Sequence, residues 1–535
     1  FGLASRRFAP GPAPVVVPPG AQAGDLTMVP CRYATEQGDY AADCGTLIVP
    51  ENPANPASRL IALPVTRIRA TSGHPATPLF YLEGGPGLTN MRFKQASRYA
   101  RDRDVVLVGY RGVDGSVRLD CPEVAAALGR AADFLGEESF RAYGDAFRAC
   151  AARLTAAGVD LAGYGLPQEV DDLEAARAAL GYDRIDLLSQ SAGTRTALIY
   201  AWRHPDQIHR SVMVGVNPPG HFLWDARTID EQIARYADLC TRDARCRART
   251  DDLAASLRRT AADMPDRWLF LPINAGAVRV FSFYGLMEST PAEAPLNAPA
   301  TLDSWLSAAE GDASGFWLQS LFARFFPIPF VWGQYASAAR LDSGTARDHF
   351  SMGGPDRTSL AWVGSAFAWG GGRLADAWPA APDEDAYRRV RTSQVETLLI
   401  GGALDTSTPP QVAATELLPH LPNGRQVVLP GLGHTASFFA EQPEAGSHLI
   451  TTFLDSGRVD DSLYGPQQLD FAPTVTLPAI AKAVAAATAG LAAVTVLSLL
   501  WVGRRVHCYG RYGRVEPRTS VVLRTMNPRR PRVRP

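Results

Sequence analysis

The chain has 535 residues, of which 46% are apolar and 20% charged, and this is the composition of a globular protein. At about 100 to 200 residues per domain it is long enough for several domains, so a short peptide module is excluded. Its 53 basic and 54 acidic residues leave a net charge of -1, which gives no reason to expect a nucleic-acid partner.

Proline and glycine are dense near the start of the chain. Residues 9–24 read APGPAPVVVPPGAQAG, which is too rich in proline for a helix or a central strand. We therefore expect a Pro/Gly-rich N-terminal arm over residues 1–44. Because the sequence starts with phenylalanine, we also expect a processed or truncated product without a visible signal peptide.

Residues 45–222 alternate short β-branched runs with helical stretches. The predicted strands are 60–68, 79–82, 105–108, 185–188 and 211–216, and the predicted helices are 167–180 and 192–203. Such alternation favours a mostly parallel sheet with helices on both faces. We expect the first half of an α/β core here.

A glycine-rich turn, Glu83-Gly84-Gly85-Pro86-Gly87, follows the predicted strand at 79–82. In a hydrolase of α/β architecture a loop at this point supplies a backbone amide to the developing oxyanion. We predict that Gly85 supplies this amide, with Gly84 as the alternative. A plain turn is the other interpretation.

Ser191 stands where a predicted strand turns into a predicted helix. The pentapeptide Ser189-Gln190-Ser191-Ala192-Gly193 follows the pattern G-x-S-x-G, except that serine replaces the first glycine. A nucleophile on such a tight turn needs small residues two positions before and after it. We predict that Ser191 is a nucleophile and that Ala192 supplies the second oxyanion amide. A helix-capping serine is the alternative.

The alternation breaks down over residues 223–394, which are helical and rich in Trp and Phe. A helical insertion between two halves of one sheet explains this pattern better than two consecutive domains. A carboxylate in such an insertion is suited to holding a substrate ammonium. The available acids are Glu288, Glu293, Glu310 and Asp312. No motif selects among them; we take Glu288 and Glu310 as candidates, with a solvated surface role as the alternative.

Strand character returns in residues 395–456, the expected second half of the core. Asp405 and His434 each stand just beyond a predicted strand of this half. After Ser191 they complete the order Ser, Asp, His of an α/β-hydrolase triad, with the histidine as general base and the aspartate orienting it. Taken alone, Asp405 could equally cap the helix that follows it, and His434 could be an ordinary loop residue.

These motifs resemble the α/β-hydrolase family of prolyl iminopeptidases and tripeptidyl aminopeptidases, especially its secreted bacterial group with a tripeptidyl-aminopeptidase-like C-terminal part. The resemblance covers about residues 45–456 and rests on YLEGGPG, VVLVGYRGVDGS, DDLEAARAALGYDRIDLLSQSAGTRTALIYAWRHP, IGGALDTSTPP and VLPGLGH. It implies that residues 223–394 form a cap over the active site and that the substrates are peptides with a free N-terminus. Ser189 and Ala192 stand where the family has Gly and Tyr.

One long apolar run, residues 483–503, lies near the end of the chain. At 1.5 Å per residue it reaches about 31 Å, enough to cross the hydrocarbon core of a bilayer. We predict a linker at 457–478, a transmembrane helix at 479–503 and a basic cytoplasmic tail at 504–535, which holds ten arginines and one acid. By the positive-inside rule the catalytic part then lies outside the cell or in the periplasm. A buried core helix is the alternative.

Cysteine usage agrees with that orientation. The six cysteines before the apolar run form three local groups, Cys31/Cys44, Cys121/Cys150 and Cys240/Cys246, and Cys508 follows the run. Six cysteines allow fifteen pairings, so pairing between neighbours is one choice among several, and free thiols are the alternative. An even number on one side favours disulfides in an oxidising compartment.

The sequence therefore predicts a membrane-anchored, extracytoplasmic serine hydrolase of α/β-hydrolase fold. The first hypothesis is an aminopeptidase that releases N-terminal residues or short peptides through an acyl-enzyme on Ser191. A carboxylesterase or lipase with the same triad, and a catalytically silent binding subunit, are the alternatives. We expect no cofactor and no metal, because no cysteine spacing makes a convincing zinc site, and the oligomeric state stays open.

Overall fold

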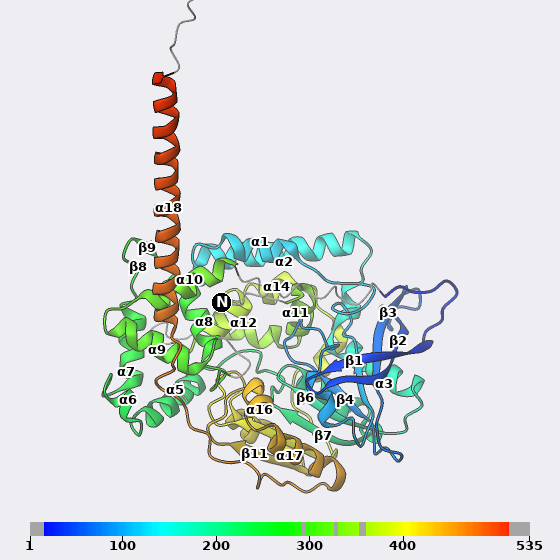
Figure 1. Cartoon of the computed structure of the whole chain (residues 1–535). Helices are drawn as coiled ribbons and strands as arrows, with labels where there is room; N and C mark the ends of the chain where they lie inside the picture. Colours follow the sequence, from blue (N-terminus) through cyan, green and yellow to red (C-terminus); the bar gives the residue numbers. More distant parts are fainter. Residues whose placement is uncertain (1–14, 292–295, 326–329, 353–359, 513–535) are drawn as a thin grey trace, which may run out of the picture. The chain divides into compact units, whose positions relative to one another are not determined.

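The computed structural model describes residues 15–291, 296–325, 330–352 and 360–512, and a nine-stranded sheet organises this part of the chain (Figure 1). The strand order is β1-β2-β3-β5-β4-β6-β7-β10-β11. The strands are β1 Leu26–Thr35, β2 Gly38–Pro50, β3 Leu60–Ile68, β4 Leu79–Leu82, β5 Val105–Val108, β6 Ile185–Gln190, β7 Ile208–Val214, β10 Thr397–Gly402 and β11 Gly424–Leu429. From β5 to β11 all neighbours are parallel, whereas β1, β2, β3 and β5 pair antiparallel. The predicted mostly parallel sheet is confirmed.

The central strands are apolar because both faces of the sheet are covered. In β5, Val106 and Val108 belong to one buried cluster, and Val105 and Leu107 belong to another. Successive side chains of a strand point to opposite faces, so a strand buried on both faces needs an unbroken apolar run. The helices of the core are α1 Pro122–Arg130, α2 Glu137–Ala156, α3 Leu166–Ala179, α4 Gly193–Arg203, α15 Pro410–Val412, α16 Thr435–Glu441 and α17 Pro443–Ser456.

The predicted N-terminal arm ends much earlier than residue 44. The chain is already in the sheet from Leu26, because β1 and β2 form an antiparallel hairpin closed by the Cys31–Cys44 disulfide. In β1 the side chains alternate between partly buried and exposed over most of its length, which is the pattern of an edge strand with one packed face. The Pro/Gly-rich run ends at residue 24, so the proline density excludes regular structure only up to that point.

Among the described residues between β7 and β10, the regular structure is helical apart from the two-residue strands β8 Arg267–Trp268 and β9 Leu271–Pro272. Its helices are α5 Ala226–Cys240, α6 Ala244–Arg247, α7 Leu253–Ala262, α8 Ala275–Gly285, α9 Ala298–Ala309, α10 Ser314–Phe325, α11 Trp332–Ala339, α12 Ser343–Ser351, α13 Val363–Trp369 and α14 Leu374–Ala377. The insertion expected over residues 223–394 is therefore present as a run of helices.

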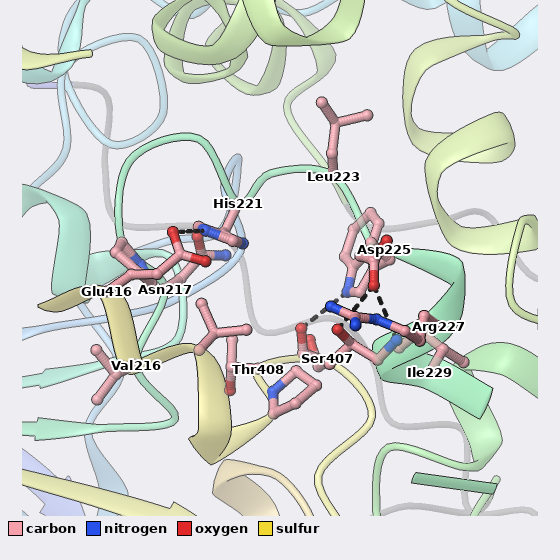
Figure 2. A pocket seen from close by; sticks show the side chains of 15 residues that line it. Val216, Asn217, His221, Leu223, Asp225, Arg227, Ile229, Ser407, Thr408 and Glu416 are labelled. Carbon is pink, nitrogen blue, oxygen red and sulfur yellow. Dashed lines mark hydrogen bonds and ion pairs between the residues drawn. The ribbon is translucent and has the colours of Figure 1, made fainter. Parts of the chain in front are cut away.

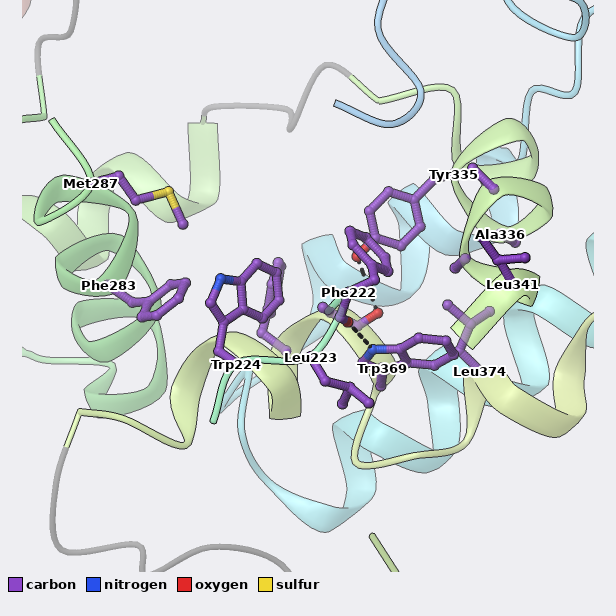
Figure 3. Close-up of a cluster of buried hydrophobic side chains, with 14 of the residues drawn as sticks. Phe222, Leu223, Trp224, Phe283, Met287, Tyr335, Ala336, Leu341, Trp369 and Leu374 are labelled. Atoms are coloured by element: carbon purple, nitrogen blue, oxygen red, sulfur yellow. Dashed lines mark hydrogen bonds between the residues drawn. The ribbon is translucent and has the colours of Figure 1, made fainter. Parts of the chain in front are cut away.

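Aromatic side chains hold this insertion against the chain that leaves β7 (Figure 3). The ring of Phe222 packs on Tyr335 of α11 and Trp369 of α13, with centroids 5.4 and 6.0 Å apart. The indole of Trp369 also donates a hydrogen bond to the Phe222 carbonyl at 2.6 Å. Trp224 makes an edge contact with Phe283 of α8. Close packing of these rings fixes the start of the insertion at the carboxyl edge of the sheet.

The C-terminal helix α18, Leu477–Tyr512, extends into a separate unit that begins at Ala481. Its segment Leu477–His507 is the one helix in the described ranges that is long and apolar enough to cross a membrane, and its most apolar stretch is not buried in the protein. The predicted transmembrane segment lies within it. In the first unit, disulfides join Cys31 to Cys44, Cys121 to Cys150 and Cys240 to Cys246, so the pairing between neighbours is the one adopted.

Candidate active site

Ser191 occupies the turn between β6 and α4, at the carboxyl edge of the sheet. Its backbone φ is +50°, in the left-handed region that a residue with a Cβ rarely adopts. The turn is held by a hydrogen bond from the Ser191 N–H to the Val214 carbonyl at 2.9 Å. Such strain persists only where the surrounding structure enforces it, as it often does at active sites.

Small residues around this turn are required by the space available. A Cβ on Gly193 would lie 2.6 Å from the carbonyl oxygens of Leu82 and Glu83, and a Cβ on Gly84 would lie 2.8 Å from the Cβ of Ser191. Ser189, which replaces glycine in the expected pattern, is fully buried, and its hydroxyl donates to the Val212 carbonyl at 3.3 Å. The departure from G-x-S-x-G therefore leaves the turn intact.

The structure brings the three predicted triad residues together from three separate loops. His434 Nε2 lies 2.9 Å from Ser191 Oγ, and His434 Nδ1 lies 2.7 Å from Asp405 Oδ2. Asp405 follows β10, and His434 precedes α16 after β11. This is a connected row of hydrogen bonds in which the imidazole is oriented by the carboxylate and faces the alcohol.

Thr408 is a member of this network that the sequence did not reveal. Its hydroxyl donates to Asp405 Oδ2 at 2.6 Å and lies 3.2 Å from His434 Nδ1. The backbone N–H groups of Ser407 and Thr408 both donate to Asp405 Oδ1. Every donor stabilises the charged form of the carboxylate, so the buried Asp405 stays ionised.

The electrostatics of the pair follow from burial and opposite charge. Burial alone raises the pKa of Asp405, but the His434 charge and the Thr408 donors outweigh it and the pKa is below its ordinary value. Burial alone lowers the pKa of His434, but the negative charges of Asp405, Glu288 and Glu83 outweigh it and the pKa is raised. A base with a raised pKa is neutral only at higher pH, so an activity that needs neutral His434 falls as the pH drops through that raised value.

At the glycine-rich turn the hydrogen bonds distinguish Gly85 from Gly84 as the residue whose N–H is available to an oxyanion. The Gly84 N–H donates to Glu83 Oε1 at 2.7 Å, so this alternative amide is already used inside the protein. Gly85 has a φ of +125°, a conformation suited to glycine. Ala192 directly precedes α4 and follows the serine. Gly85 and Ala192 thus remain as the pair of amides for an oxyanion.

Glu83 gives the turn its shape, and sequence reasoning assigned it no role. Its carboxylate accepts hydrogen bonds from the Tyr81 hydroxyl at 2.8 Å, from the Gln190 side-chain amide and from Gly84. Its backbone carbonyl accepts a bond from the Tyr110 hydroxyl. Burial raises the pKa of Glu83 above its ordinary value. In the sequence, the one sign of this role was the position of an acidic residue directly before the glycines of the turn.

Glu288 lies close to His434 but its carboxylate has protein partners. One oxygen accepts the Ala436 N–H at 3.0 Å, and the other accepts the N–H and the hydroxyl of Ser437 at 2.9 and 2.8 Å. These donors lie in the first turn of α16, directly after His434, where a carboxylate is favourable. The backbone carbonyl of Met287 also accepts the backbone N–H of His434 at 2.7 Å. Through these hydrogen bonds of Met287 and Glu288, the insertion holds in place the loop that carries His434.

Replacing Glu288 by glutamine is expected to move the acid limb of the kcat/KM profile to lower pH. The substitution removes a negative charge that raises the pKa of His434, so the imidazole becomes neutral at lower pH. Steady-state kinetics between pH 5 and 9 measure the midpoint, and Glu310→Gln is the matched control because that carboxylate binds Arg249 elsewhere. An acid limb at the wild-type position in Glu288→Gln would refute this coupling.

The other candidate acids of the insertion that the structure describes have hydrogen-bond partners outside the triad. Glu310, directly after α9, binds Arg249 at 2.8 Å and is about half exposed, so its carboxylate already has a cationic partner and its role as a substrate ligand stays a prediction. Long arginine side chains form such surface pairs readily, and no motif reveals them in advance. Asp312 accepts the Ser314 N–H at the start of α10. Glu293 lies outside the described residues.

A cavity of about 140 Å³ lies next to the triad, between the chain after β7 and the loop after β10 (Figure 2). His221 and Glu416 form a hydrogen bond of 2.7 Å on one side of it, and Asp225 lies across the opening. Thr408 belongs to its lining, whereas Ser191 and His434 do not. The cavity therefore adjoins the acid loop without opening on the nucleophile.

Within the described ranges, one group of side chains has the spacing of a metal site, Cys121, Glu123 and Cys150. Its two sulfur atoms are joined in a disulfide, so they are not available as thiolate ligands. The chemistry offered at Ser191 is that of an alcohol, an imidazole and a carboxylate.

Two family matches cover the parts of the chain that carry these residues. Residues 77–267 match the family described as alpha/beta hydrolase fold, and residues 362–464 match the family described as TAP-like protein. Ser191 lies in the first range, and Asp405 and His434 lie in the second. The two matches leave out most of the helical insertion.

Curated relatives are similar over part of the chain. A tripeptidyl aminopeptidase of Streptomyces lividans is 29% identical over 272 residues, which cover 45% of this chain and 49% of that protein. The serine protease Hip1 of Mycobacterium tuberculosis is 27% identical over 236 residues, covering 41% and 45%. The chain thus spans about half the length of the curated relatives it matches.

Among solved structures, a proline iminopeptidase of Mycobacterium smegmatis has 17% identity and a TM-score of 0.37, covering 74% of this chain and 94% of its own. An esterase of Thermogutta terrifontis has 15% identity and a TM-score of 0.34, covering 76% and 96%.

Proposed function

Since this chain is an α/β-hydrolase of the tripeptidyl aminopeptidase type, we propose that it is a serine aminopeptidase that releases N-terminal residues or short peptides. The observation that carries the proposal is the row Asp405, His434 and Ser191, with 2.7 and 2.9 Å between the bonded atoms. An alcohol that contacts an imidazole, itself fixed by a carboxylate, is the arrangement that activates serine as a nucleophile.

In the proposed reaction His434 Nε2 takes the proton of Ser191 Oγ as that oxygen attacks the scissile carbonyl carbon. The negative charge then develops on the carbonyl oxygen, where the N–H groups of Gly85 and Ala192 donate hydrogen bonds. His434 returns the proton to the leaving amine, and an ester to Ser191 remains. Water attacks this acyl-enzyme with the same histidine as base, which releases the N-terminal product and restores the serine.

Peptides are favoured as substrates because the curated relatives are named as a tripeptidyl aminopeptidase and a serine protease. The experiment that tests the proposal is profiling of the purified protein on peptide anilides with free and acetylated N-termini, beside acyl p-nitrophenyl esters. Preference for free N-termini supports an aminopeptidase. Turnover of esters alone would favour the carboxylesterase hypothesis, and turnover of neither class would favour a silent binding subunit.

We also propose that α18 anchors the protein in a membrane with its C-terminal end in the cytoplasm. The apolar segment Leu477–His507 and the arginines that follow residue 503 support this orientation, as do the three disulfides of the first unit. Arginines next to a bilayer also bind anionic lipid headgroups.

Deletion of the chain after residue 480 is expected to give a folded protein that stays in the supernatant, because the first unit ends at Ile480. Ultracentrifugation of membranes from cells that make the full chain or the deleted form measures the partition, with hydrolase activity followed in both fractions. Sedimentation of the deleted form with the membranes would contradict anchoring by α18.

A further inference from the structure

A second, smaller cavity lies beside the glycine-rich turn and has space for about one water-sized group. Its lining includes Gly84 and Ala192, which belong to the two turns that surround Ser191. It also includes Glu169 of α3, Arg195 of α4 and Gln334 of α11. Polar side chains from three helices thus line a cavity that reaches the two turns around the nucleophile, and the proposed reaction uses none of these side chains.

Glu169 is a buried acid whose hydrogen-bond partners are neutral. Gln334 Nε2 donates to its Oε1 at 2.5 Å, and the Thr196 hydroxyl donates to its Oε2 at 3.3 Å. Burial raises the pKa of Glu169 to about 8, because its neighbours do not offset the cost of a buried charge. A cation in contact with this carboxyl would favour its ionised form.

Gln334 offers a second acceptor that the protein leaves unused. Its side chain is 2% exposed, and its Nε2 is bound to Glu169. Its Oε1 is buried and has no hydrogen-bond partner in the described part of the chain. Buried acceptors are nearly always paired, so an unpaired one in the wall of a cavity points to a donor that arrives with a ligand.

Arg195 does not make the cavity repel a cation, because its charge is balanced. Its Nη2 binds Asp342 at 2.8 Å, and both side chains are buried. Its Nε is also buried without a partner among the described residues. The Arg195 charge is therefore compensated inside the protein, and the lining offers a cation the acceptors of Glu169 and Gln334.

From these contacts we propose that the cavity receives the N-terminal ammonium of the substrate, a group of about the size of a water molecule, held by the Glu169 carboxylate and Gln334 Oε1. The inference rests on the proposed function and deepens it by naming the amine-binding groups. Since Gly84 and Ala192 line the same cavity, the ammonium is held close to the scissile carbonyl. This proximity limits cleavage to the first few residues. The carboxylate expected in the insertion is thus supplied by the core.

The test compares kcat/KM for one peptide anilide with a free N-terminus and the same anilide acetylated. The ratio of the two is measured for the wild type, Glu169→Gln and Gln334→Met. Because both substrates are assayed on one preparation, the ratio is independent of the amount of folded protein. We expect the wild type to prefer the free amine by at least about tenfold, and each substitution to reduce this preference by about tenfold or more, as for a lost hydrogen bond to a charged group.

Glu174→Gln is the matched control, because Glu174 lies on the same helix but binds Arg177 and Tyr200 instead. Its ratio is expected to equal that of the wild type. A wild type without preference for the free amine would refute the proposed aminopeptidase function itself. A wild type with the preference, but with the ratio unchanged in both Glu169→Gln and Gln334→Met, would overturn the assignment of the cavity alone.

Discussion

Replacing Ser191 by alanine is expected to lower kcat/KM by on the order of 10⁴-fold or more while the protein stays folded. The substitution removes the oxygen that lies 2.9 Å from His434 Nε2, so no acyl-enzyme is formed. Alanine keeps the Cβ that the turn already accommodates at a positive φ, and the packing of the turn is retained. Hydrolysis of a free peptide anilide measures the loss, and circular dichroism measures the fold.

Ser189→Ala is the control for this experiment. Ser189 lies two residues away on the same strand, fully buried, and its hydroxyl donates only to the Val212 carbonyl, at 3.3 Å. Its loss is expected to reduce activity by less than about tenfold, because one neutral hydrogen bond is removed away from the reacting atoms. Turnover by Ser191→Ala near the wild-type rate would rule out Ser191 as the nucleophile.

Replacing Asp405 by asparagine is expected to lower kcat/KM by about 10⁴-fold, with little effect on the fold. One side-chain oxygen still accepts the N–H groups of Ser407 and Thr408. The other becomes an amide that cannot accept a proton from His434 Nδ1, so the imidazole is held in the wrong tautomer and its cation is not stabilised. The measurement is kcat/KM on the same anilide, beside the thermal midpoint of unfolding.

Asp252→Asn serves as the control, because Asp252 caps α7 by accepting the Ala255 N–H and lies outside the triad network. Asparagine also caps helices well, so activity near that of the wild type is expected. If Asp405→Asn lost less than about tenfold in kcat/KM, the orienting role of the carboxylate would have to be abandoned.

The arrangement of the site followed largely from strand order. Ser191, Asp405 and His434 each stand just past a run of apolar residues, and such runs become parallel strands whose carboxyl ends meet at one edge of the sheet. The sequence therefore predicted that the three loops meet, although the residues are far apart along the chain. The apolar pattern itself is dictated by burial on both faces, as in β5.

What could not be predicted depends on side chains that reach across elements. Thr408 joins the network only because its loop turns back on Asp405. Glu169 and Gln334 are 165 positions apart and meet through helix packing that no local pattern encodes. Glu310 is an available ligand by charge, and its pairing with Arg249 in the folded protein could not be predicted from the sequence. In the N-terminal part, strand β1 was not predicted, because it follows a proline-rich run and because an edge strand with one packed face has only a weak alternation of apolar and polar residues.

The central claim is that Ser191 is an activated nucleophile, and covalent trapping tests it most directly. The purified full chain is treated with a fluorophosphonate, digested, and the modified residue is located by tandem mass spectrometry. We expect a single phosphonyl group on Ser191, which appears fastest at a pH where His434 is neutral. Modification of another residue by the folded protein, or no modification at all, would contradict it.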